Sequence, residues 1–405
     1  MPSMVDYDTA QALLAAALHD LTPVRGERIP VSEAAGRVLA QDVYAVTARP
    51  EADISAMDGY AFHSEEMQKA GQAGLPVVGY VAAGDCPAAL LHGTASIILT
   101  GARIPEGADC VVAREYTVLQ QNHVTLTKPV TGKGLNIRRK GEEFSPGKRL
   151  LRRGQGLDWR HMPLLLSQGM TDVEVYRPVT VSILANGAEF GEQAGDGRTE
   201  LNTHMLAAMM RSGTVHVTRL VAASDSKEEL REALVRYLGQ SDVIVTTGGI
   251  SVGDTDHVLA VLLEMGASCV FRRVSMRPGK PVTVMRLGGK IVFCLPGNPG
   301  AAAFCAQLFV LPCLRALSRA SGTPENIWPV RGRSAFTYTA PAQATCFLPV
   351  SIAQKPGEGA FFNLVPSVGA SDISCLTHAD GLVQIDAGQS LEIGQECDML
   401  PFTGI

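Results

Sequence analysis

Three glycine-bearing turns, each following a short apolar run, lie within residues 243–300 of this 405-residue chain. They are carried by VIVTTGGISVGDTDHV at Val243–Val258, MRPGKP at Met276–Pro281 and LPGNPG at Leu295–Gly300. Turns of this kind come side by side when their strands are parallel neighbours, and ligands of open α/β sheets bind at the carboxyl ends of the strands. Glycine lets successive backbone N–H groups approach an anion closely. The sequence therefore predicts a site for a phosphorylated or otherwise anionic ligand.

Strand and helix patterns alternate from Pro178 to about Ser321. Strands are predicted at Val179–Leu184, Val215–Val221, Val243–Thr247, Ser268–Arg273, Val282–Met285 and Ile291–Cys294. Helices are predicted at Asn202–Arg211, Lys227–Leu238, Val258–Met265 and Ala301–Arg319. Because the central runs are rich in β-branched residues, we predict a three-layer α/β domain with a mostly parallel sheet covered on both faces.

The chain length predicts about two to four domains. We expect a discontinuous linker domain of residues 1–45 and 145–177, in which the helix Tyr7–His19 packs with Asp172–Val175. A β-rich domain of residues 46–144 would be inserted into it. The α/β domain would span residues 178–326, and a C-terminal β-barrel or sandwich residues 327–405, where short strand patterns are separated by glycine-rich turns.

Composition limits the function classes. The net charge is −5, from 40 acidic and 35 basic residues, which argues against a nucleic-acid partner. The nine cysteines form no CxxC pair, which favours reduced thiols over a disulfide framework or zinc site. The polar N-terminus is not that of a signal peptide, and no apolar run reaches the length of a membrane span. We therefore expect a cytoplasmic protein without a membrane span.

Several further motifs have two interpretations when each is taken alone. SAMDGYAF at Ser55–Phe62 and LTGARIPEGAD at Leu99–Asp109 could be ordinary turns. NIRRKGEE at Asn136–Glu143 could be a solvated loop or an anion clamp, because arginine pairs bind oxyanions well. Glu189 follows the first predicted strand of the α/β domain. The chain has no Walker-type phosphate loop, no HExxH metal motif and no GxSxG nucleophile elbow.

The motifs occur in one order across almost the whole chain: SAMDGYA, TGAxxPxGAD, RRKGEE, TTGGISVGDTD, RPGKP and LPGNP. This ordered set closely resembles the molybdopterin molybdenumtransferase family, which includes bacterial MoeA proteins, the E domain of gephyrin and plant counterparts. The resemblance implies insertion of molybdate into adenylylated molybdopterin with release of AMP, assisted by Mg²⁺. It also implies a homodimer whose site lies between the α/β domain of one subunit and the inserted domain of the other. Molybdopterin adenylyltransferase and molybdoenzymes or their chaperones would be pathway partners.

The resemblance assigns site residues by motif position. The expected catalytic residues are Asp58, Thr100, Glu189, Asp225 and Asp256. The expected ligand-binding residues are Gly248, Gly249, Ser251, Gly253, Arg277, Lys280, Pro296, Gly297, Asn298, Pro299, Arg138, Arg139 and Ser371. The expected metal ligands are Glu189 and Glu143.

The chain departs from the family pattern at several of these motifs. NGAEF stands where TGDEL is usual, so that Asn186 replaces a threonine and Ala188 an acid. Other departures are Glu143 for aspartate, Arg277 for lysine, Pro349 for a common arginine and Ile54 for asparagine. Loss of the acid could weaken metal binding, and loss of the arginine could weaken molybdate binding. Besides an active transferase, a paralogue that carries molybdopterin or scaffolds a partner therefore remains an alternative.

Overall fold

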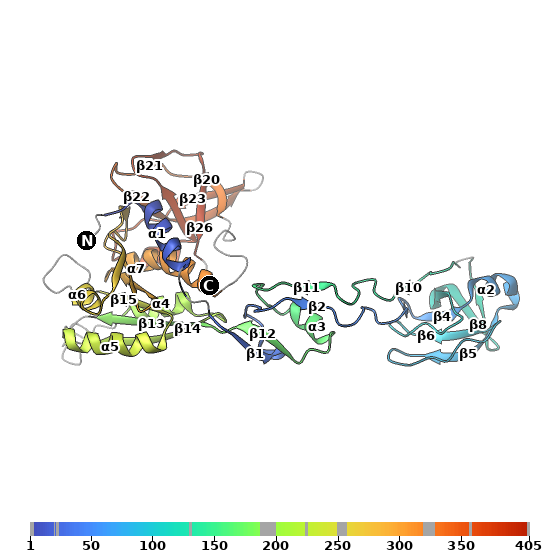
Figure 1. Ribbon diagram of the computed structural model, residues 1–405. Coiled ribbons are helices and arrows are strands. Elements are labelled where there is room, and N and C mark those ends of the chain that lie inside the picture. The colour runs from blue at the N-terminus through green and yellow to red at the C-terminus, as the bar shows by residue number, and fades with distance from the viewer. Residues whose placement is uncertain are drawn as a thin grey trace. The chain divides into compact units, whose positions relative to one another are not determined.

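The computed structural model describes residues 4–19, 21, 24–128, 132–186, 200–222, 226–248, 257–318, 329–355 and 359–402. The chain forms two compact units (Figure 1). The first, here called the main unit, consists of Met1–Gln41 and Arg153–Ile405, and the second, the inserted unit, of Asp42–Arg152. The residues predicted to form the inserted domain, 46–144, fall within the inserted unit.

A six-stranded sheet forms the centre of the main unit. Its strands, in spatial order, are β14 (Val215–Ala222), β13 (Val179–Asn186), β15 (Val243–Thr247), β19 (Lys290–Leu295), β18 (Thr283–Leu287) and β16 (Ser268–Arg272). The first four are mutually parallel, and β18 runs antiparallel to both of its neighbours. The prediction of a mostly parallel sheet is therefore confirmed.

Helices cover both faces of this sheet. One face packs on α5 (Lys227–Gln240) and α6 (His257–Glu264), with Ile244 and Val292 pointing toward them. The opposite face, which includes Val245, packs on four helices. They are α1 (Tyr7–His19), α4 (Asn202–Met210), α7 (Pro299–Cys305) and α8 (Leu311–Leu317). Side chains alternate between the two faces of a strand, so a continuous apolar run such as β15 must be buried on both sides.

The most buried helical segment runs through α7, a π-helical turn at Ala306–Val310, and α8. Among the described residues, Pro299–Leu317 is the one helix long and apolar enough to cross a membrane by length and composition. Its most apolar part is 83% buried inside the protein. Its composition is thus accounted for by packing in the core, because a helix that is apolar on all sides is stable when protein surrounds it.

The N-terminal helix packs differently from our expectation. We predicted that α1 packs with Asp172–Val175, whereas α1 contacts α8 and β16. Tyr7 makes edge-to-face ring contacts with Phe309 and with Phe347. The strand β12 (Asp172–Tyr176) instead pairs with β1 (Gly26–Pro30). The α/β domain offers the apolar side of α1 a larger surface to pack against than the two-stranded ribbon of β1 and β12 can provide.

The C-terminal residues form a closed barrel of five strands. The strands are β20 (Val330–Ser334), β22 (Thr345–Lys355), β23 (Gly359–Leu364), β24 (Gly381–Ile385) and β26 (Glu396–Pro401). The pairing of β22 with β24 closes the ring. A short strand of the α/β domain, β17 (Met276–Arg277), adds to the barrel by parallel pairing with β22. The RPGKP turn is therefore attached to both domains.

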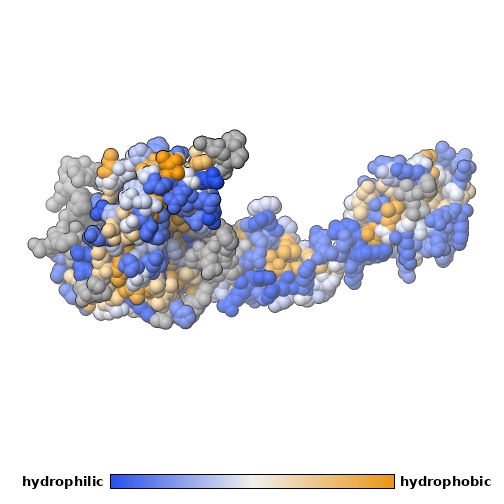
Figure 2. Space-filling view, turned by 90° about the horizontal axis from the view of Figure 1, so that it is seen from above, coloured by the Kyte–Doolittle hydropathy of each residue, from blue (hydrophilic) through white to orange (hydrophobic). Residues whose placement is uncertain are grey.

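The inserted unit has a six-stranded sheet of its own, consistent with the predicted β-rich domain. Its strands, in spatial order, are β7 (Cys110–Ala113), β4 (Gly59–Phe62), β6 (Ala95–Ile98), β5 (Leu75–Val81), β9 (His123–Leu126) and β8 (Thr117–Gln120). The helix α2 (Ser64–Ala70) supplies Met67 to the core beneath it. Apolar side chains such as Val78 and Tyr80 are exposed, and Figure 2 shows hydrophobic areas set among hydrophilic ones.

The remaining elements are short. The inserted unit contains two further pairs, β2 (Val43–Tyr44) with β11 (Arg149–Leu151) and β3 (Ile54–Ser55) with β10 (Ile137–Arg138). The main unit contains α3 (His161–Leu166), α9 (Ser374–His378) and the pair β21 (Tyr338–Thr339) with β25 (Ser390–Leu391). β3 leads directly into the SAMDGYA motif, and α9 follows the loop that carries Ser371.

We predict that Gly279→Ala destabilises the main unit by about 2–4 kcal/mol. Gly279 has a φ of +103°, and an added Cβ would lie 2.6 Å from the Cys305 sulfur. The matched control is Gly239→Ala in α5, where nothing lies within 4 Å of the added carbon. That control should raise the free energy of unfolding by no more than about 1 kcal/mol. Urea unfolding measures both, and equal effects of the two changes would contradict the prediction.

Candidate functional site

Two of the three predicted glycine turns lie side by side. β15 and β19 are parallel neighbours, with Thr247 opposite Leu295, so the residues after each strand meet at the same edge of the sheet. Gly248 has a φ of +85°, and its N–H donates to the Leu295 carbonyl at 3.3 Å. A Cβ on Gly297 would lie 3.5 Å from the Gly248 Cα. This geometry brings two backbone turns together with no side chain between them, as an anion-binding edge requires.

The third turn is at the same edge but not on an adjacent parallel strand. RPGKP connects β16 to β18, and β18 lies antiparallel between β16 and β19. Our expectation that all three turns follow neighbouring parallel strands is therefore wrong for this one. A connection this short cannot cross over the sheet, so it reverses the chain direction instead. Arg277 and Lys280 make no ion pair within the part of the chain that the structure describes, so both cations can bind an anion.

A buried asparagine that the sequence analysis did not identify connects the two glycine turns. Asn202 begins α4 and is 7% exposed. Its Nδ2 donates to Thr247 Oγ1 and to the Gly297 carbonyl, both at 2.7 Å. Thr247 Oγ1 in turn donates to the Pro296 carbonyl at 3.2 Å. An asparagine at a predicted helix start is normally interpreted as a cap, so its position alone does not indicate this role.

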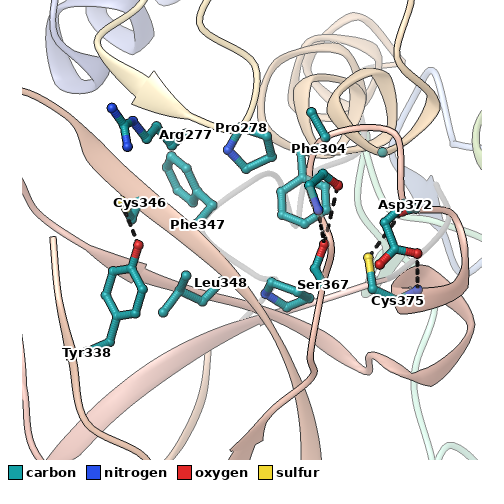
Figure 3. Close-up of a pocket in the computed structure, with 14 residues that line it drawn as sticks. Arg277, Pro278, Phe304, Tyr338, Cys346, Phe347, Leu348, Ser367, Asp372 and Cys375 are labelled. Carbon is teal, nitrogen blue, oxygen red and sulfur yellow. Dashed lines mark hydrogen bonds between the residues drawn. The ribbon is translucent and has the colours of Figure 1, made fainter. Parts of the chain in front are cut away.

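A pocket of about 360 Å³ lies between the α/β domain and the barrel (Figure 3). Arg277 lies beside Cys346 and Phe347 of β22, with which β17 pairs, and Ser367, Asp372 and Cys375 lie on another side of the pocket (Figure 3). The other lining residues are Pro278, Gly300, Phe304, Tyr338, Leu348, Pro349, Gly369 and Ala370. The lining is thus largely apolar, and among the described residues that line it Arg277 is the one basic side chain.

The polar groups of this pocket are mostly occupied by other protein groups. The Asp372 carboxylate accepts hydrogen bonds from the Ser374 hydroxyl and from backbone N–H groups, and these lower its pKa to about 2. Tyr338 donates to the Cys346 sulfur at 3.6 Å, and this bond raises the pKa of Tyr338. Burial raises the pKa of the Cys375 thiol. At neutral pH the Asp372 side chain is therefore anionic, and the Tyr338 hydroxyl and the Cys375 thiol are neutral.

Of two residues discussed from sequence, Pro349 lines this pocket and Ser371 does not. Pro349 is buried in β22 and lines the cavity. Ser371 is exposed, in the loop whose Ala370 carbonyl accepts the N–H of Ala301 at 3.0 Å. A Cβ on Gly300 would lie 2.8 Å from that carbonyl, so the glycine allows this loop to approach the start of α7. Asn298 and Pro299, of the LPGNP motif, also lie at the start of α7, as its N-cap and its first residue.

In the inserted unit, the structure brings Asp58 and Thr100 together. The Thr100 backbone N–H and its hydroxyl both donate to Asp58 Oδ1, each at 2.7 Å. These two hydrogen bonds hold the pKa of Asp58 below its ordinary value. Ser55 fixes the preceding turn, because its hydroxyl donates to the Met57 carbonyl at 2.6 Å. The motifs SAMDGYA and TGA thus come together so that Thr100 orients the ionised carboxylate of Asp58.

The RRKGEE segment is a network of ion pairs. Arg138 contacts Glu143 at 2.7 Å, and Arg49 contacts the same carboxylate at 3.0 Å. Arg139 contacts Asp53 at 2.6 Å. The bond from Arg138 lowers the pKa of Glu143. An anion or a metal ion that bound these groups would compete with the partners they already have.

Several predicted site residues lie outside the described part of the chain. They are Glu189, Asp225, Gly249, Ser251, Gly253 and Asp256, together with the departure at Ala188. Among the residues that are described, no group of three or more His, Cys, Asp or Glu side chains could hold a metal ion.

Two family models match the chain. Residues 5–169 match "MoeA N-terminal region (domain I and II)", and residues 182–316 match "Probable molybdopterin binding domain". Together the matches cover both the inserted unit and the sheet that carries the glycine turns.

Relatives along most of the chain carry one name. A protein of Synechococcus elongatus named molybdopterin molybdenumtransferase is 32% identical over 327 residues, 77% of this chain and 80% of its own length. A Staphylococcus epidermidis protein of the same name is 32% identical over 73% of this chain and 72% of its own. Among solved structures, a molybdopterin biosynthesis MoeA protein of Pyrococcus horikoshii matches with a TM-score of 0.81 and 27% identity, covering 100% of both chains.

We predict that Thr100→Val raises the pKa of Asp58 toward its ordinary value. Valine removes the hydroxyl bond and leaves the backbone N–H bond, so the ionised carboxylate loses one of its two donors. Side-chain ¹³C NMR titration of the Asp58 carboxyl measures the change. The control is Thr125→Val in the same unit, whose hydroxyl contacts the Val118 carbonyl instead. An unchanged Asp58 pKa in Thr100→Val would contradict the prediction.

Proposed function

The chain belongs to the molybdopterin molybdenumtransferase family, and we propose that it inserts molybdate into adenylylated molybdopterin with release of AMP. It is a transferase of molybdenum cofactor biosynthesis.

One observation carries the proposal for this chain: the glycine turns at Gly248 and Gly297 lie together at the carboxyl edge of the parallel sheet. Backbone N–H groups at such an edge can bind the phosphates that link molybdopterin to AMP. We assign the same role to Gly249, Ser251 and Gly253, with Pro296, Asn298 and Pro299 shaping the second turn. Lys280 and Arg277 would neutralise the remaining phosphate charge, and their lack of ion-pair partners in the described residues supports this role.

We propose Asp58 and Thr100 as catalytic residues. Thr100 fixes the direction of the Asp58 carboxylate by donating twice to Oδ1. No hydrogen bond to Oδ2 occurs within the described chain, so this oxygen can orient a water molecule or a cation. We retain Glu189, Asp225 and Asp256 as further catalytic candidates, Arg138 and Arg139 as ligand-binding candidates, and Ser371 at the loop beside α7.

We propose Mg²⁺ as the assisting cation, with Glu189 as its first candidate ligand. Mg²⁺ prefers carboxylate oxygens and retains several waters, so one or two carboxylates suffice. It would supply charge stabilisation at the phosphoryl group. Glu143 fits this role poorly because two arginines already hold its carboxylate.

We further propose that the protein is a cytoplasmic homodimer. The ligand must be supplied by an adenylyltransferase that acts on molybdopterin, and the product must pass to molybdoenzymes or their chaperones. Closed symmetric dimers are the commonest assemblies of soluble proteins.

The test of the proposed function is AMP release from adenylylated molybdopterin, with and without molybdate, at saturating Mg²⁺. Molybdate-dependent release is the expected result. Asp58→Asn should reduce the rate at least about tenfold, because the neutral amide loses the charge that orients the reacting groups. Absence of release above background in the wild-type protein would refute the transferase reaction.

A second candidate function is favoured by the pocket in Figure 3. Pro349 lines it where an arginine is common in the family, and the other lining side chains are mostly apolar. Molybdate is a doubly charged oxyanion that requires several donors, so a pocket with Arg277 as its one cation would bind it weakly. The protein could then carry molybdopterin, or scaffold a partner, with little turnover. Molybdopterin binding without AMP release would support this function.

We predict that Pro349→Arg lowers the molybdate concentration required for half-maximal AMP release about three- to tenfold, because it adds a second guanidinium to the pocket. The control is Gln389→Arg, which adds the same charge at an exposed turn outside the pocket lining. Steady-state kinetics at varied molybdate concentration measure both variants. Equal effects of the two changes, or no effect of Pro349→Arg, would show that the position does not limit molybdate binding.

A further inference from the structure

Asn202 presents a buried hydrogen-bond acceptor that no described residue satisfies. The side chain is 7% exposed, and both amide hydrogens are accounted for by Thr247 and Gly297. Its Oδ1 is buried and has no donor among the residues that the structure describes. Such atoms are rare in folded proteins, because an unpaired acceptor loses its hydrogen bonds to water without replacement.

The orientation of the amide follows from its partners. The Gly297 carbonyl can only accept, so the atom facing it must be the nitrogen. Thr247 donates its one hydroxyl hydrogen to the Pro296 carbonyl and is left to accept from Asn202. Exchange of the amide oxygen and nitrogen would place two acceptors face to face at Gly297. The unpartnered atom is therefore the oxygen.

The position of this oxygen suggests what could bind it. Asn202 starts α4 at the carboxyl edge of the sheet, against the two turns that would hold phosphate. A phosphate has no N–H group to offer an acceptor, whereas the backbone N–H groups of the turns suit it well. An acceptor at this edge suits an N–H donor, and the pterin of the proposed ligand carries N–H and NH₂ groups.

We infer that Asn202 is a positioning and specificity residue: its Nδ2 holds the Gly248 and Gly297 turns in register, and its Oδ1 accepts a hydrogen bond from the pterin of bound molybdopterin. This inference rests on the proposed function, because the ligand is the one named there. The buried amide would thereby distinguish a pterin phosphate from other phosphates that the glycine turns admit.

If Asn202 only holds the turns together, loss of either clamp residue should weaken ligand binding in the same way. A Thr247 variant therefore helps to distinguish a structural role of Asn202 from a ligand-binding role. Thr247→Val keeps the side-chain shape and leaves Oδ1 in place, but it removes the hydroxyl that links Nδ2 to Pro296. Asn202→Ala removes the same link and also Oδ1. Asn202→Ala also removes the bond to the Gly297 carbonyl, so Thr247→Val tests one half of the clamp, and the comparison of molybdopterin with AMP separates Oδ1 from the rest of the clamp.

The experiment measures dissociation constants for molybdopterin, under anaerobic conditions, and for AMP, which carries a phosphate but no pterin. We expect Asn202→Ala to weaken molybdopterin binding about tenfold, the effect of losing one neutral hydrogen bond, and AMP binding less than about twofold. Thr247→Val should change either constant less than about threefold. Circular dichroism and thermal unfolding establish that each variant is folded.

If Asn202→Ala does not fold, Asn202→Asp replaces it, because aspartate has the same shape and retains an acceptor at Oδ1. Its charge repels both phosphate ligands alike, so the ratio of the two dissociation constants should stay at the wild-type value. A tenfold change in this ratio would overturn the inference.

The other outcomes are distinct. Equal weakening of molybdopterin and AMP by Asn202→Ala, or equal effects of Thr247→Val and Asn202→Ala on molybdopterin, would reduce Asn202 to a structural clamp and leave the proposed function intact. Failure of the wild-type protein to bind molybdopterin would refute the proposed function and, with it, this inference.

Discussion

The parallel pairing of β15 with β19 is the constraint on which the site in the main unit depends. This pairing ends both strands at one edge, and each strand is followed there by a glycine. A side chain at Gly297 would point toward Gly248, and Gly248 adopts a backbone conformation that other residues rarely accept. The apolar composition of both strands places them at the centre of the sheet, where helices on both faces hold them rigid. Two adjacent backbone turns on packed strands have the fixed arrangement that the proposed phosphate site requires.

The short RPGKP segment joins the sheet to the C-terminal barrel. Its first residues pair with β22, while Gly279 packs directly against Cys305 of α7. The pocket in Figure 3 lies at this junction, so its shape depends on both domains. Pro349 and the aromatic side chains make this pocket less polar than an oxyanion site requires. In the proposed function, phosphate would bind at the sheet edge and molybdate in this less polar pocket, so the two would bind with different strength.

In the inserted unit, the local structure orients one carboxylate, that of Asp58, at an exposed position. Exposed carboxylates are ionised at neutral pH in any case, so the hydrogen bonds from Thr100 serve mainly to fix the direction of Asp58. Ser55 fixes the turn before it. The ion pairs of Arg138 and Arg139 with nearby acids show the same principle in the neighbouring loop, where charges are held in place by one another.

The sequence alone determined the order and type of the elements in the α/β domain, because hydrophobic periodicity and the glycine and proline residues that end helices and strands are local properties. Val243–Thr247 was predicted with the bounds that the structure has, and the α4, α5 and α6 predictions differ by no more than two residues at either end. Ordered motifs also identified the family and named Asp58 and Thr100 as site candidates, whereas their hydrogen bonds to each other were found only in the structure. Long-range choices were decided only by tertiary structure: the packing of α1 on α8, the antiparallel insertion of β18, and the clamp formed by Asn202. Each depends on groups that are distant in the sequence. α1 packs where the fold presents a large apolar surface, and Asn202 binds where the fold presents a carbonyl and a hydroxyl group. No local sequence pattern indicates where such surfaces and groups lie.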